Sequence, residues 1–199
     1  MNLVSVTRSS TDKQGTLILM HGLGSDEQDM FGLSQLIDER VEVICLRAPI
    51  RYGPGFAWFD IQWSEAGISV DPQQVKQSID NLWGNIRTFD LTNAVIGGFS
   101  QGAMMALGTI QANPQSFAGL MMLSGRGNGY GCPGFLGEVF QAHGAYDDVI
   151  SIGDAHALRN DLLNLLGRHE YHEYPMGHSI CDDEINDLNQ WLEKVLNLK

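Results

Sequence analysis

The hydrophobic positions along the chain alternate between two patterns. Short apolar runs are typical of strands buried inside a sheet, whereas apolar residues that recur every three or four positions are typical of amphipathic helices. The predicted strands are residues 3–7 at an edge, 16–20, 41–46, the run from 94 to the glycines before residue 100, 117–123, 138–144 and 168–174. The predicted helices are residues 28–39, a long one opened by Asp71 and Pro72, one from residue 101 to near 113, 153–166 and 182–196.

Strands that alternate with helices in this way specify an α/β fold: a mostly parallel central sheet with helices on both faces. No Ser/Pro-rich linker or block of charge divides the chain, which predicts a single domain over residues 1–199. Residues 126–137 are too few to hold an inserted lid domain. Residues 51–70 interrupt the alternation with aromatic side chains, which either cover the core or form the wall of a pocket.

Composition narrows the class of protein. Apolar residues make up 43% and charged residues 18%, as in ordinary globular proteins. Residues 1–12 contain no apolar core of signal-peptide length, and no run of about 18 apolar residues occurs anywhere in the sequence. The three cysteines, Cys45, Cys132 and Cys181, are odd in number and lack metal-ligand spacing, which suggests neither a disulfide framework nor a zinc site. A cytoplasmic protein is therefore expected.

The formal net charge of −12 argues against nucleic acid and anionic membrane surfaces as partners. A protein that neutralises phosphates needs a basic face, and the 12 Lys and Arg residues are spread too thinly to build one. A small-molecule or acylated substrate remains as the expected partner, and the sequence leaves open whether the chain forms a homodimer.

The strand that begins at Ala94 ends in Gly97-Gly98-Phe99-Ser100-Gln101-Gly102 and turns at once into a helical pattern. This is the pattern of a nucleophile elbow, in which a serine sits in strained backbone geometry between a strand and a helix. Gly98 and Gly102, two positions before and after the serine, leave room for the close approach of the strand and the helix. Ser100 is therefore a candidate nucleophile.

A serine hydroxyl needs a general base, and the base needs a carboxylate to orient it. In the hydrolase version of this sheet the order along the chain is Ser, Asp, His, each after a strand. Asp147 fits the acid position, although spacing does not exclude the adjacent Asp148, and Asp154 has a simpler explanation near a helix start. His178 fits the base position.

The other candidate bases are weaker. His169 and His172 lie within a predicted strand and point to opposite faces of it, so they neither pair as metal ligands nor reach the carboxyl end of that strand. His178 instead lies in a loop after the strand, where catalytic groups gather.

Five motifs in order make the chain resemble the phospholipase/carboxylesterase family of α/β-hydrolases, which includes the acyl-protein thioesterases. They are His21-Gly22-Leu23-Gly24, Trp58-Phe59-Asp60, the elbow at Ser100, His143-Gly144-Ala145-Tyr146-Asp147 and Gly177-His178. The resemblance covers residues 15–196 and implies Ser100 as nucleophile, Asp147 as acid and His178 as base. Ile150-Ser151, where the family commonly has Val-Pro, and the glycine-rich residues 126–134 depart from the pattern and bear on substrate preference.

On this scaffold the backbone N–H groups of Leu23 and Gln101 are the expected oxyanion hole. Phe31, Trp58, Phe59 and Met176 are the predicted apolar wall for an acyl chain. The chemistry requires no cofactor and no metal.

The leading hypothesis is a serine carboxylesterase that hydrolyses acyl esters through an acyl-enzyme. An acyl-protein thioesterase, a lysophospholipase and a catalytically silent relative that binds acyl groups are the alternatives. A structural or interaction protein on the same fold has no sequence feature in its favour beyond the acidic surface, although fold alone does not decide function.

Overall fold

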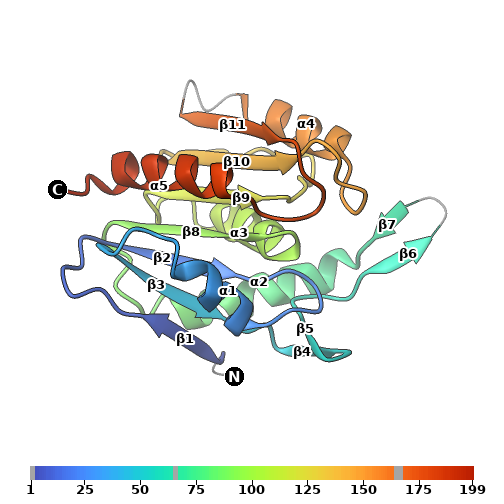
Figure 1. The fold of residues 1–199 in the computed structure, drawn as a ribbon. Coiled ribbons are helices and arrows are strands. Elements are labelled where there is room, and N and C mark those ends of the chain that lie inside the picture. The colour runs from blue at the N-terminus through green and yellow to red at the C-terminus, as the bar shows by residue number, and fades with distance from the viewer. Residues whose placement is uncertain (1–2, 65–66, 164–167) are drawn as a thin grey trace.

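The computed structural model describes residues 3–64, 67–163 and 168–199, and a seven-stranded sheet forms its centre (Figure 1). In spatial order the strands are β1 (Ser5–Arg8), β3 (Val41–Leu46), β2 (Gly15–Met20), β8 (Ala94–Phe99), β9 (Gly119–Leu123), β10 (Glu138–Gly144) and β11 (His169–Tyr174). β1 pairs antiparallel with β3, and every other neighbouring pair in this sheet is parallel.

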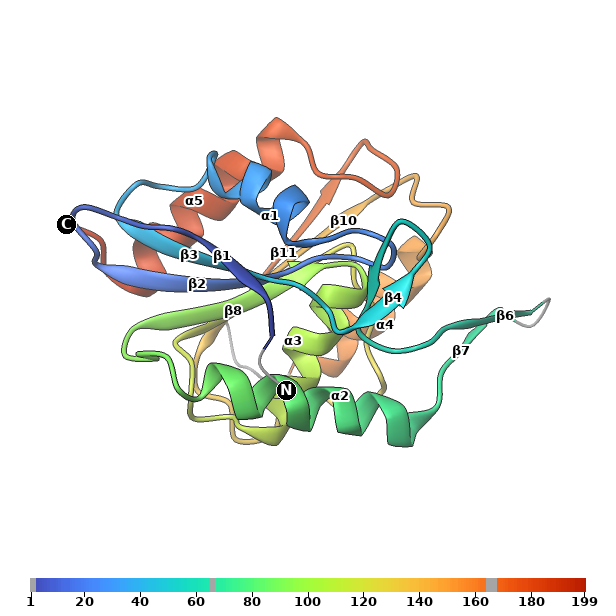
Figure 2. The ribbon, with the colours of Figure 1, turned by 90° about the horizontal axis from the view of Figure 1, so that it is seen from below.

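Helices cover both faces of this sheet (Figure 2). One face carries α1 (Glu27–Ser34) and α5 (Asp182–Leu196), and the other carries α2 (Pro72–Ile86), α3 (Gln101–Ala112) and α4 (Ile152–Asp161). Because successive side chains of a strand point to opposite faces, Ile18 belongs to the core under α2 and α3, whereas Leu17 and Leu19 belong to the core under α1 and α5. The predicted α/β architecture is confirmed.

The predicted elements are present, with differences at their ends. The ranges 41–46, 138–144 and 182–196 coincide with β3, β10 and α5. Helix α1 ends at Ser34, earlier than predicted, and the chain continues in tight turns in which the N–H of Ile37 donates to the Ser34 carbonyl. These turns still bury Ile37, which explains the apolar spacing seen in the sequence. Helix α4 ends at Asp161, and residues 164–166, the end of the predicted helix, lie outside the described residues.

The segment that interrupts the alternation folds into two hairpins that the sequence did not predict. They are β4 (Ile50–Tyr52) with β5 (Gly55–Ala57), and β6 (Gln62–Ser64) with β7 (Gly67–Ser69). Gly53 has a φ of 56° in the first turn, a conformation that glycine adopts at no steric cost. Strands of three residues are too short to show a period of two, which is why the pattern of apolar positions missed them.

The parallel strands direct their carboxyl ends to one edge of the sheet, and the predicted catalytic residues follow those ends. Ser100 follows β8, Asp147 follows β10 and His178 follows β11. Residues 124–137 form no helix or strand, so the expectation that no lid domain lies between β9 and β10 is confirmed. None of the helices in the described ranges has the length and apolar character needed to cross a bilayer.

Candidate active site

Ser100 lies at a sharp turn between β8 and α3. Its φ of 55° and ψ of −114° are rare for a residue with a side chain, and its N–H is held by the Leu123 carbonyl at 2.8 Å. The turn requires glycine on both sides of the serine. A Cβ on Gly98 would lie 2.6 Å from the Met20 carbonyl oxygen, and one on Gly102 would lie 2.2 Å from the same atom. The strained serine and the two glycines form the elbow that the sequence predicted.

His178 and Asp147 form a hydrogen-bonded pair at the same edge of the sheet. Nδ1 of His178 lies 2.7 Å from Oδ2 of Asp147. The other carboxylate oxygen, Oδ1, accepts hydrogen bonds of 2.9 Å from the backbone N–H groups of Val149 and Ile150. His143 lies beneath the pair, with Nε2 3.3 Å from Oδ2 of Asp147. The carboxylate is therefore fixed in orientation behind the imidazole.

Two opposing effects act on the charge of Asp147. Burial acts to raise the pKa of this carboxyl, but the hydrogen bonds from His178, Ile150 and Val149 together outweigh it and hold the pKa below its ordinary value. The group is thus ionised at neutral pH and can stabilise a protonated imidazole. Asp148, the alternative that spacing left open, is exposed, and Asp154 lies in the first turn of α4, where its N–H bonds the capping Ser151.

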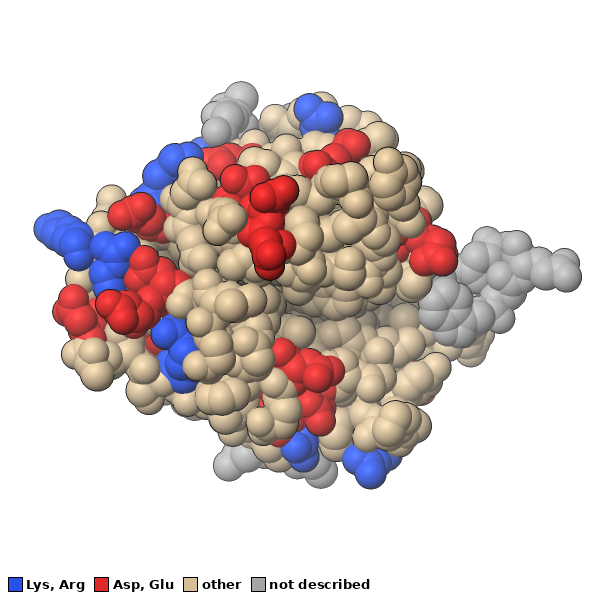
Figure 3. Space-filling model, viewed as in Figure 1, with Lys and Arg blue, Asp and Glu red and all other residues tan. Residues whose placement is uncertain are grey.

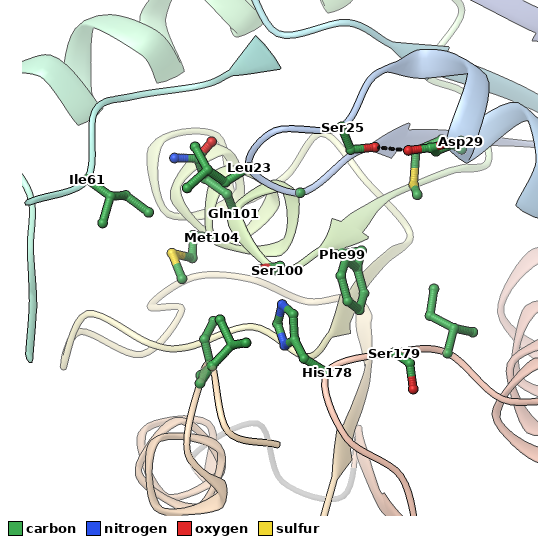
Figure 4. A pocket seen from close by; sticks show the side chains of 15 residues that line it. Leu23, Ser25, Asp29, Ile61, Phe99, Ser100, Gln101, Met104, His178 and Ser179 are labelled. Atoms are coloured by element: carbon green, nitrogen blue, oxygen red, sulfur yellow. Dashed lines mark hydrogen bonds between the residues drawn. The ribbon is translucent and has the colours of Figure 1, made fainter. Parts of the chain in front are cut away.

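Ser100 and His178 line one pocket of about 430 Å³ (Figure 4). The described residues that line it are mostly apolar, among them Leu23, Met30, Ile61, Phe99, Met104 and Ile180. The aromatic ring of Phe99 lies against the His178 ring, with 4.7 Å between the ring centroids. The predicted nucleophile, the predicted base and an apolar surface therefore meet in one cavity.

The two predicted oxyanion donors both border this pocket. Within the described part of the chain, neither the N–H of Leu23 nor that of Gln101 donates a hydrogen bond, and Gln101 begins α3, where first-turn N–H groups have no helical partner. The β4–β5 hairpin holds the loop of Leu23 in place: the N–H of Gly24 donates to Phe56 O at 2.8 Å, and the N–H of Phe56 donates to Ser25 O at 2.9 Å. This support for the loop was not visible in the sequence.

Trp58 and Phe59, predicted as pocket wall, lie in the core instead, with exposures of 1% and 2%. Their backbone is tied to the elbow, because the Gln101 side chain accepts from the Trp58 N–H at 2.8 Å and donates to Phe59 O at 2.7 Å. The Trp58 indole donates to the His21 carbonyl at 2.9 Å. These residues brace the elbow and the loop of Leu23, and they do not line the pocket of Ser100.

Phe31 and Met176, the other two residues of the predicted wall, also do not line the pocket. Both pack against the core between the sheet and the helices α1 and α5. The apolar lining comes from residues that the sequence did not single out, such as Ile61 after β5 and Met104 on α3. No signal in the sequence marked these two, because an apolar residue beside a hairpin or on a helix is ordinarily core.

In the residues that the structure describes, no group of three or more His, Cys, Asp or Glu side chains is placed to hold a metal ion. A strained serine at a strand-to-helix elbow, near a His–Asp pair on a mostly parallel sheet, is the arrangement that defines serine hydrolases of the α/β class. Residues 1–196 match the model of the phospholipase/carboxylesterase family, and the chain belongs to this family.

Relatives and solved structures agree with this membership. Acyl-protein thioesterase 1 of Mycosarcoma maydis is 31% identical over 98% of this chain and 96% of its own length. Acyl-protein thioesterase 1 of Saccharomyces cerevisiae is 27% identical over 99% of this chain and 100% of its own length. In fold, the chain is similar to the Bacillus cereus carboxylesterase, with a TM-score of 0.82 and 21% identity over 97% of this chain and 94% of that one. The protein is a serine hydrolase that acts on ester bonds.

Proposed function

We propose that the protein hydrolyses acyl esters through an acyl-enzyme, with Ser100 as nucleophile, His178 as general base and Asp147 as the carboxylate that orients it. The observation that carries the proposal is the shared pocket. Ser100, strained at a φ of 55°, and His178, whose Nδ1 lies 2.7 Å from Asp147, line the same cavity.

Each residue has one role in the proposed reaction. The Oγ of Ser100 attacks the ester carbonyl carbon as its proton passes to Nε2 of His178, while Nδ1–H donates to Asp147. The negative charge that develops on the carbonyl oxygen is stabilised by the N–H groups of Leu23 and Gln101. When the intermediate collapses, the C–O bond to the alcohol breaks and His178 returns the proton to the leaving oxygen. Water then hydrolyses the acyl-enzyme by the same steps.

The apolar lining near Ile61 and Met104 is suited to the acyl chain of the substrate. The 31% identity to an acyl-protein thioesterase favours a second candidate, a thioester substrate with the same three residues. A thiolate is an easier leaving group than an alkoxide, so the same site accommodates both chemistries without a change of role for any residue.

The test of the proposed function compares the wild type with Ser100→Ala. The wild type is expected to react with a fluorophosphonate probe at Ser100 and to hydrolyse a panel of acyl esters and thioesters of graded chain length. The variant is expected to stay folded, to take up no probe and to lose turnover by on the order of 10⁴-fold. Turnover within ten-fold of the wild type in the variant would place the nucleophile elsewhere.

Asp147→Asn and Asp148→Asn form a matched pair for the carboxylate, because they change adjacent residues of which one is buried against His178 and the other is exposed. Asp147→Asn is expected to lower kcat by about 10⁴-fold, since the amide holds the wrong imidazole tautomer. Asp148→Asn is expected to change kcat less than two-fold, as surface substitutions ordinarily do. Equal losses in the two variants would contradict the assignment of Asp147.

A further inference from the structure

The pocket around Ser100 has two chemically different sides. In Figure 4, Ile61 and Met104 lie on one side of Ser100, whereas Ser25, Asp29 and Phe99 lie on the other. The apolar side chains of Ile61 and Met104 face the pocket on the first side, and the side-chain amide of Gln101 there is bonded to the backbone of Trp58 and Phe59. The second side carries a carboxylate, because Asp29 is the acidic residue among those described as lining the pocket.

The Asp29 carboxylate is held in place but its charge is not neutralised. The hydroxyl of Ser25 donates to Oδ2 of Asp29 at 2.5 Å and so orients the carboxylate. Within the described residues, no Lys or Arg pairs with Asp29 or lines the pocket, and Arg47 is engaged instead by Glu27 of the same helix. Asp29 is exposed in the first turn of α1. The second side of the pocket therefore has a fixed negative charge.

The chemistry of the proposed reaction places the alcohol part of the ester on this second side. His178 must return a proton to the leaving oxygen, so the alcohol has to lie next to the imidazole. The imidazole lies against the Phe99 ring at an interplanar angle of 48° and is followed in the chain by Ser179, and both residues line the pocket. Phe99 and Asp29 lie on the same side of Ser100. An alcohol that leaves along the Phe99 side of the imidazole therefore extends towards Asp29.

We propose that Asp29, oriented by Ser25, is a specificity-determining residue that favours substrates whose alcohol carries a positively charged, substituted ammonium group. The inference rests on the proposed function, because it needs Ser100 and His178 to define the position of the leaving group. An opposite charge at the end of a short alcohol lowers the free energy of the bound ester, and the effect weakens as salt screens the carboxylate.

The test uses two esters of the same shape, butyrylcholine and 3,3-dimethylbutyl butyrate, in which a carbon replaces the charged nitrogen. The measured quantity is the kcat/KM for butyrylcholine divided by the kcat/KM for 3,3-dimethylbutyl butyrate. Because the intrinsic reactivity of each ester is the same for every variant, a change in this ratio on Asp29→Asn reports the carboxylate alone. At low ionic strength the ratio is expected to fall about five-fold in Asp29→Asn.

Glu39→Gln is the matched control, since it also removes one negative charge. Glu39 is exposed between α1 and β3, near the amino end of β3 and therefore at the edge of the sheet opposite the pocket. The ratio in Glu39→Gln is expected to equal that of the wild type. A ratio unchanged in Asp29→Asn, or lowered equally in Glu39→Gln, would overturn the inference.

Raising the ionic strength with 0.5 M NaCl tests the wild type itself, independently of how well a variant folds. The ratio is expected to fall towards the value of Asp29→Asn, and a ratio that does not respond to salt would also overturn the inference. Ser100→Ala distinguishes a failure of the proposed function from a failure of the proposed specificity. Hydrolysis of both esters that persists in Ser100→Ala refutes the proposed function, whereas Ser100-dependent hydrolysis with no effect of Asp29 refutes the specificity alone.

Discussion

At the scale of single residues, Glu184 is an acid that the proposed reaction does not use. Its side chain is fully buried in the first turn of α5, and neither carboxyl oxygen has a hydrogen-bond partner of good geometry among the residues that the structure describes. Burial raises the pKa of Glu184 to about 8, against a smaller opposing effect of the Cys181 backbone. The folded protein therefore holds a neutral carboxyl at neutral pH, where the unfolded chain has an ionised one.

This difference makes stability depend on pH. Between the unfolded pKa of about 4.3 and the folded pKa of about 8, unfolding releases a proton from Glu184, so the free energy of unfolding falls as pH rises through that range. Glu184→Gln removes this dependence. We expect the wild type to lose roughly 2–4 kcal/mol relative to Glu184→Gln between pH 4.5 and 8.5. Urea unfolding at both pH values measures the difference.

Asp183→Asn is the control for this prediction, because Asp183 is the exposed neighbour of Glu184 on α5. Its stability difference from the wild type should be nearly independent of pH. If the difference in the free energy of unfolding between the wild type and Glu184→Gln is the same at both pH values, the protonation of Glu184 does not change on unfolding and the prediction is wrong.

At the scale of elements, the junction of β2, β8 and α3 determines where Ser100, the proposed nucleophile, lies. The backbone of Gly102 touches the last residue of β2, so that an added Cβ would lie 2.2 Å from the Met20 carbonyl oxygen. Backbone atoms cannot move aside as the end of a flexible side chain can. The elbow therefore tolerates no side chain at this position without separating the helix from the sheet.

Gly102→Ala and Gly84→Ala test this constraint as a pair, since both glycines lie in helices. We expect Gly102→Ala to lower the free energy of unfolding by about 3 kcal/mol, because overpacking forces backbone shifts, and to lower kcat as well. Gly84 is exposed on α2, and apart from its own helix no described atom lies within 4 Å of an added Cβ. Gly84→Ala is expected to raise the free energy of unfolding by about 0.5–1 kcal/mol. Urea midpoints measure both, and a Gly102→Ala variant as stable as the wild type would disprove the close packing.

At the scale of the whole molecule, the net charge of −12 acts on substrates before they bind. Figure 3 shows acidic and basic side chains interspersed on one face, with no extended basic patch among the side chains drawn there. A polyanionic substrate is repelled by such a surface at low salt. The charge of the molecule thus bears on which acyl donors reach Ser100.

Butyryl-CoA and the neutral N-acetylcysteamine thioester of butyrate share the same acyl group and thioester bond. At low ionic strength we expect kcat/KM to be roughly ten-fold lower for butyryl-CoA, and the gap to narrow about three-fold in 0.5 M NaCl as the charges are screened. Steady-state kinetics at the two salt concentrations measure this. A higher kcat/KM for butyryl-CoA at low salt would refute the effect of net charge.

Local patterns in the sequence were sufficient for the α/β architecture and for the geometry around Ser100. Strands buried on both faces are mostly apolar, and helices on a sheet are apolar on one side, so β3 and α5 were predicted with their observed ends. The ends of β10 were predicted as well, although this strand also buries the polar residues Gln141 and His143. The elbow was predictable because the glycines that it requires, at positions 98 and 102, lie within two residues of Ser100 in the chain. Both pack against the end of the adjacent strand β2. The order of strands then brought Asp147 to His178.

Only the tertiary structure decided which residues form the pocket. Aromatic residues in an irregular segment suit a pocket wall and a core equally well. In the structure Trp58 lies in the core, where its indole donates to the His21 carbonyl. The positions of Ile61, Met104 and Asp29 around Ser100 depend on segments far apart in the chain. A side chain's direction there results from packing between those segments, which no local pattern of apolar and polar residues records.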